Sequence, residues 1–242
     1  MKILLLQARH PDDPAKAEEV GSFARRSGVE LKAITPHDLL QGPPALEELN
    51  GWDVLMVGGS GDFYLSQGDL PFQEETLSFL GGVVERGFPT FASCFGYQCL
   101  VVALGGELLY DPQNTELGTL DIHLTPAGIE DELFSILPAT FAGQLGHKDR
   151  AIHPPPGLPN LAFSDRCAHQ ALRVPDKPIW ATQFHPELDR ETNYGRFQTY
   201  LDGYANAMSP DELARAHLHY RESPETATLL PAFLEIVRRQ LA

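Results

Sequence analysis

The chain has 242 residues, of which 43% are hydrophobic, which is enough for one domain with an appendage and a sizeable core. The formal net charge of −15 would repel nucleic-acid phosphates and anionic membrane surfaces, so neither is expected as a direct partner. The three cysteines match neither a disulfide framework nor a CxxC metal site, and the first apolar run is too short for a signal peptide or a membrane span. We therefore expect a cytoplasmic protein with reduced cysteines.

Short apolar runs alternate with amphipathic stretches, which predicts an α/β fold with a mostly parallel central sheet flanked by helices. The strands predicted in this part of the chain span residues 2–8, 29–35, 53–59 and 89–93. The predicted helices span residues 13–28, 70–87 and 97–106. From about residue 105 to 184, short strand-like runs separated by turns predict a small antiparallel elaboration at one side of the sheet. The acidic run at 130–132 is predicted to be a solvated helix start.

The last stretch of the chain predicts a helical C-terminal tail. Residues 209–212 have the serine, proline and glutamate of a capping box, and apolar residues recur at helical spacing from residue 194 onward. We assign residues 1–190 to the main domain and 191–242 to a helical extension. The favoured prediction is that this extension packs on the chain's own sheet. The alternative is that part of it docks a partner, or a second copy in a homodimer.

Cys94 lies where a predicted strand ends and a helix begins. Small residues, Ala92 and Gly96, stand two positions before and two positions after it. A sharp strand-turn-helix elbow needs such neighbours, and the free N–H groups at a helix start stabilise a thiolate. Cys99 and Cys167 lack this placement and are assigned to packing. Cys94 is therefore the predicted nucleophile.

His185 and Glu187 provide a base for this thiol and a carboxylate to orient the base. They flank Pro186 at the end of a predicted strand. The carboxylate can hold one imidazole nitrogen while the other nitrogen faces the sulfur. A lone His-x-Glu pair is a weak signal, but its combination with an elbow cysteine is specific to nucleophilic catalysis.

The two motifs together resemble class I, or triad-type, glutamine amidotransferases, which carry G-x-C-x-G-x-Q at the elbow and H-P-E near the end of the domain. This chain has ASCFGYQ at 92–98 and HPE at 185–187, and the resemblance covers about residues 1–190. It implies hydrolysis of the L-glutamine side-chain amide, with Cys94 attacking the carbonyl and His185 moving the proton to the departing ammonia. We expect neither a metal nor a cofactor.

The resemblance also implies roles for residues around the triad. The glycine-rich stretch at 57–62 matches a family loop, so that Gly59 and Phe95 would supply the oxyanion-hole N–H groups. The positions matching substrate-binding segments are Gln98, Gly61, Gly146 and His147. Ala92 departs from the usual family glycine, which is tolerable if its backbone needs no positive φ.

Three functional classes stay open on the sequence. The first is a glutaminase that feeds ammonia to a separate synthetase, since the sequence shows no ATP-binding motif. The second is a stand-alone hydrolase of γ-glutamyl compounds, which a panel of γ-glutamyl peptides would distinguish from the first. The third is a non-catalytic relative, and the joint presence of Cys94, His185 and Glu187 counts against it.

Overall fold

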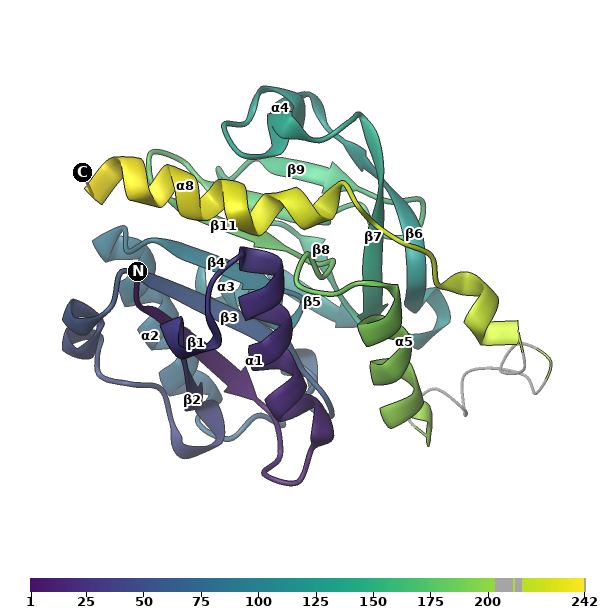
Figure 1. Ribbon diagram of the computed structural model, residues 1–242, viewed down its shortest axis with the longest axis horizontal. Helices are drawn as coiled ribbons and strands as arrows, with labels where there is room; N and C mark the ends of the chain where they lie inside the picture. Colours follow the sequence, from purple (N-terminus) through teal and green to yellow (C-terminus); the bar gives the residue numbers. More distant parts are fainter. Residues whose placement is uncertain (203–210, 212–214, 242) are drawn as a thin grey trace.

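The computed structural model describes residues 1–202, 211 and 215–241 (Figure 1). The strands are β1 (Ile3–Ala8), β2 (Ile34–Asp38), β3 (Val54–Ser60), β4 (Thr90–Ser93), β5 (Glu107–Tyr110), β6 (Glu116–Leu124), β7 (Thr140–His147), β8 (Asp149–His153), β9 (Asn160–Phe163), β10 (Ala171–Val174) and β11 (Ile179–Thr182). The helices are α1 (Pro14–Ser27), α2 (Gln73–Arg86), α3 (Phe95–Ala103), α4 (Pro126–Glu130), α5 (Arg190–Thr199) and α8 (Leu229–Leu241). Over these described ranges, no helix is long and apolar enough to cross a membrane.

The main sheet has the strand order β2-β1-β3-β4-β11-β10-β9-β6-β7, and β5 pairs with β8 in a second, small sheet. The first five strands of that order run parallel to their neighbours, whereas β10, β9, β6 and β7 pair antiparallel. This confirms the predicted α/β fold, with its antiparallel elaboration at one side. The elaboration continues the main sheet, because β10 pairs directly with β11.

The strand predicted at 29–35 is shifted along the chain. Residues Leu31–Ala33 form a short 3₁₀ turn, and β2 begins only at Ile34. Leu31 is 60% exposed, so the apolar character of this stretch does not reflect burial in the sheet. As an edge strand, β2 tolerates Pro36, which cannot donate to a ladder.

Alternate side chains of the parallel strands supply two separate cores. Ile3 and Leu5 of β1 face the core that α1 and α8 cover, and Leu4 and Leu6 face the core under α2 and α3. In Figure 1, α1 and α8 lie side by side over the first of these faces. The result is a three-layer arrangement in which each face of the sheet is covered by helices.

The C-terminal helix α8 packs on the chain's own sheet, in agreement with the favoured prediction. Its apolar stripe is buried, with Leu230 and Phe233 fully inaccessible to solvent. The ring of Phe233 meets those of Phe91 and Trp180 at centroid distances of 5.5 and 5.9 Å. The capping box expected at 209–212 lies largely outside the described residues.

The acidic run at 130–132 is not the solvated helix start that was predicted. It follows α4, and Asp131 is buried. The Asp131 carboxylate accepts hydrogen bonds from the N–H groups of Leu133 and Phe134 and from Nε1 of Trp180. The carboxylate therefore caps the next turn and ties it to β11.

Because Phe233 joins the tail to the centre of the sheet, Phe233→Ala should lower the free energy of unfolding by about 3–5 kcal/mol. Leu241→Ala in the same helix is the matched control, since Leu241 is 60% exposed and its loss should change stability by less than about 0.5 kcal/mol. Urea unfolding followed by circular dichroism measures both. Equal effects of the two substitutions would mean that α8 is not part of the core.

Candidate active site

Cys94 occupies a strained turn between β4 and α3. Its backbone has φ 52° and ψ −102°, a conformation that non-glycine residues adopt at a cost of about 1–3 kcal/mol. The Cys94 N–H donates to the carbonyl oxygen of Thr182 at 2.7 Å. A Cβ atom on Gly96 would lie 2.6 Å from the carbonyl oxygen of Val57, so only glycine fits there. Ala92 has no positive φ, which explains why alanine is tolerated at that position.

His185 and Glu187 form a buried hydrogen-bonded pair. Nδ1 of His185 donates to Oε1 of Glu187 at 2.6 Å, which leaves Nε2 of the ring for Cys94. Burial opposes a charge on the ring, but the carboxylate of Glu187 and the sulfur of Cys94 outweigh it and raise the pKa of His185 to about 10. Burial likewise opposes the charge of Glu187, but the neighbouring His185 holds the pKa of that carboxyl below its usual value. The pair therefore favours an imidazolium beside a carboxylate.

A single cavity gathers most of the residues assigned from the sequence. Those that line it are Gly61, Cys94, Phe95, Gln98, Gly146, His147 and His185. Glu187 is fully buried behind His185. Gly59 lies next to the site, because a Cβ atom placed on it would be 3.1 Å from Cε1 of His185.

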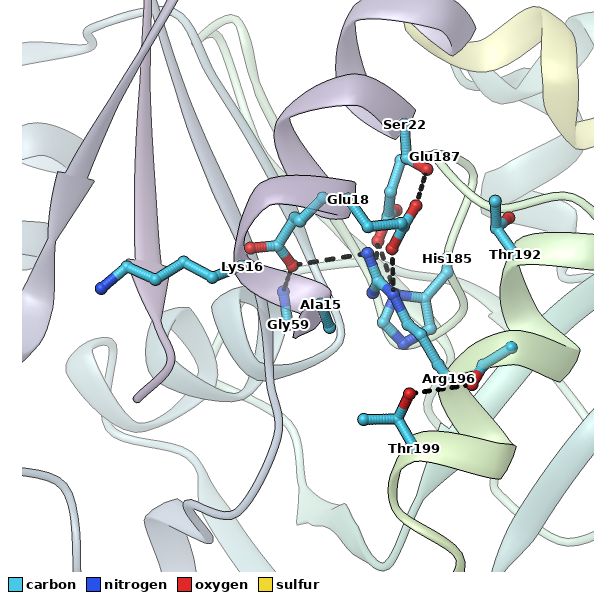
Figure 2. A network of polar contacts seen from close by, with 12 residues as sticks. Ala15, Lys16, Glu18, Ser22, Gly59, His185, Glu187, Thr192, Arg196 and Thr199 are labelled. Atoms are coloured by element: carbon cyan, nitrogen blue, oxygen red, sulfur yellow. Dashed lines mark hydrogen bonds and ion pairs between the residues drawn. The ribbon is translucent and has the colours of Figure 1, made fainter. Parts of the chain in front are cut away.

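The two predicted oxyanion-hole donors differ in this structure. The N–H of Phe95 belongs to the first turn of α3, where N–H groups have no acceptor within the helix. The N–H of Gly59 instead donates to Oε1 of Glu19 at 3.1 Å (Figure 2). Glu19 is fully buried and also accepts a hydrogen bond from Arg9 at 2.8 Å. An oxyanion role for Gly59 would require its N–H to leave this carboxylate.

Gln98 and His147 are tied to the protein as well as facing the cavity. The amide nitrogen of Gln98 donates to the carbonyl oxygen of Asp149 at 3.0 Å and to Oε1 of Gln183 at 3.2 Å. A ligand contact through Gln98 would therefore use its oxygen. The ring nitrogens of His147 lie 2.9 Å from the carbonyl oxygen of Asp149 and 2.9 Å from Oε2 of Glu116, so this ring forms a fixed wall.

Several residues around the cavity were not indicated by any motif in the sequence. Nε2 of Gln183 lies 3.7 Å from Sγ of Cys94. Helix α5, assigned to the C-terminal extension, contributes Arg196 to the lining, and Tyr200 follows directly after the helix. Tyr200 covers Gly61, where an added Cβ atom would be 2.8 Å from its hydroxyl. The spacing of four residues between Arg196 and Tyr200 was the only available sign that they share a helix face.

Residues 24–197 match the model of the family glutamine amidotransferase class-I. The glutaminase component of the glutamine-hydrolyzing GMP synthase of Methanocaldococcus jannaschii, a separate subunit, is 34% identical over 168 residues, which cover 69% of this chain and 80% of that protein. The glutamine-hydrolyzing GMP synthase of Streptococcus mutans is 30% identical over 149 residues, 61% of this chain but only 26% of that longer protein.

Among solved structures, a glutamine amidotransferase from Thermotoga maritima has the same fold, with a TM-score of 0.74 at 18% identity, and the match covers 98% of this chain and 97% of that one. The family resemblance expected from the elbow and the H-P-E motif is thus confirmed. This chain belongs to the class I glutamine amidotransferases.

Proposed function

We propose that the chain hydrolyses the side-chain amide of L-glutamine, with Cys94 as nucleophile, His185 as general acid and base, and Glu187 as the group that orients His185. The observation that carries the proposal is the strained Cys94 at the start of α3, which shares a cavity with a buried His185–Glu187 pair. A cysteine becomes nucleophilic as the thiolate, and both a helix start and a neighbouring imidazolium favour that form.

The proposed reaction has two stages. The thiolate attacks the amide carbon, and the negative charge on oxygen is stabilised by the N–H of Phe95 and, once released from Glu19, by that of Gly59. His185 gives its proton to the departing nitrogen, which leaves as ammonia and a γ-glutamyl thioester on Cys94. His185 then takes a proton from water, which hydrolyses the thioester to glutamate and restores the thiolate.

We further propose that the ammonia passes to a separate synthetase in the cytoplasm. Two findings support this: the M. jannaschii relative of similar length is named as one subunit of GMP synthase, and the chain spans about a quarter of the S. mutans GMP synthase. The cytoplasmic setting is supported by the three free cysteines, all of them buried. Comparing glutamine with γ-glutamyl peptides as substrates tests the amide specificity, and faster turnover of the peptides would favour the γ-glutamyl hydrolase alternative.

Selective labelling tests the nucleophile. A diazoketone analogue of glutamine should modify Cys94 and spare Cys99 and Cys167, and excess L-glutamine should slow the reaction. Burial raises the pKa of the Cys99 thiol far above its usual value and that of Cys167 to about 11, so both remain unreactive thiols. Peptide mapping by mass spectrometry locates the label, and a label on either of these two cysteines would refute the assignment.

Substitution of the other two triad members tests their separate roles. His185→Ala should lower kcat/KM by about 10²–10⁴-fold, the usual contribution of a general acid and base. Glu187→Gln should retain part of the activity, since an amide still holds the imidazole but stabilises its charge less. Ammonia release measures both, with Glu191→Gln on the exposed side of α5 as control. An unimpaired His185→Ala enzyme would be incompatible with the proposed mechanism.

A further inference from the structure

A buried cation lies directly behind the triad and has no role in the steps proposed above. The Arg196 side chain is only 9% exposed, and its Nη1 lies 3.8 Å from Oε1 of Glu187. Nη1 and Nη2 have no hydrogen-bond acceptor within the described part of the chain, and Oε2 of Glu187 has no donor there. Figure 2 shows Arg196 extending toward Glu187 and His185. A guanidinium edge and a carboxylate oxygen thus lie close together, out of solvent, without a full complement of partners.

Arg196 is also shared with the anions of α1. Its Nε donates to Oε2 of Glu18 at 2.9 Å, and its Nη2 lies 3.7 Å from Oε1 of Glu19 (Figure 2). Glu18 is held in turn by the hydroxyl of Ser22. The position of this guanidinium therefore depends on two elements far apart in the sequence, α1 and α5, which meet beside Glu187.

The other charged groups near the His185–Glu187 pair do not duplicate Arg196. Arg26 of α1 donates to the carbonyl oxygen of Pro186 at 3.0 Å, and Arg9, just after β1, is paired with Glu19 at 2.8 Å. Those two cations are thus engaged elsewhere by hydrogen bonds. The remaining groups that face the pair are Cys94 at the start of α3 and Glu18 and Glu19 on α1.

We propose that Arg196 is a positioning residue that sets the protonation balance of the Cys94–His185–Glu187 triad through its charge beside Glu187. A cation next to the carboxylate stabilises its ionised form and weakens its hold on the imidazolium proton. His185 then gives that proton more readily to the departing ammonia. Consistent with this geometry, Arg196 adds to the effect of His185 in holding the pKa of Glu187 below its usual value, against the opposing effect of burial.

The sign of the expected effect follows from the charge. Removing a cation raises the pKa of every ionisable group beside it, so Arg196→Met should move the whole pH profile of the triad to higher pH, by about one unit. Arg196→Lys keeps the charge and should stay close to the wild-type profile. Arg190→Met removes the same charge from the same helix, where Arg190 donates to the carbonyl oxygen of Tyr220, and should leave the profile in place.

The first readout is the rate of Cys94 alkylation by iodoacetamide as a function of pH, measured on the full chain. The second is the pH dependence of kcat/KM for glutamine. The inference rests on the proposed function only in taking these three residues as a catalytic unit. Because alkylation needs no turnover, a chain without glutaminase activity would refute the proposed function while the alkylation profile still tests Arg196.

A lower alkylation rate in Arg196→Met at every pH, with an unmoved midpoint, would overturn the proposal and leave Arg196 a packing role. A shift in Arg196→Lys as large as that in Arg196→Met would also overturn it. Glu18→Gln provides an independent variant if Arg196→Met does not fold. It removes an anion that binds Arg196, so the profile should move to lower pH, and a shift to higher pH would contradict the proposal.

Discussion

The parallel pairing of β4 with β11 is the constraint on which the site depends. Thr182 of β11 lies opposite Ser93 of β4, so the residues that follow the two strands emerge at the same edge of the sheet. Cys94 follows one strand and His185 the other, although they are 91 positions apart in the sequence. The Cys94 N–H binds the Thr182 carbonyl, so the same pairing also stabilises the strained elbow. Fold and catalytic geometry are therefore set by one contact between neighbouring strands.

Behind this edge, buried charges must compensate one another, because isolated charges out of water are costly. Glu19 is matched by Arg9, and Glu187 by His185 with Arg196 close by. The Gly59 N–H is part of the same balance, since it donates to Glu19. The charge network thus links the glycine loop to the triad, and a change in the partners of Glu19 would alter both.

Features encoded by local patterns could be predicted from the sequence. The alternation of apolar runs indicated the parallel sheet, and the small residues around Cys94 with the H-P-E motif indicated the elbow and the triad candidates. Features that arise from contacts between distant elements could not be predicted. The Glu19 carboxylate on α1 and Arg196 on α5 resemble solvated helix charges in sequence, and Asp131 resembles a surface acid, yet each is buried by partners far along the chain. No local pattern specifies those partners.

Trapping the covalent intermediate is the most direct test of Cys94 as the nucleophile. The enzyme is mixed with L-glutamine, quenched in acid within the first turnovers, digested and analysed by mass spectrometry. A γ-glutamyl adduct on the peptide that contains Cys94, lost on mild alkaline treatment as a thioester would be, is the predicted result. Glutamine turnover with no adduct on Cys94 in the quenched enzyme, or with an adduct on another residue, would contradict it.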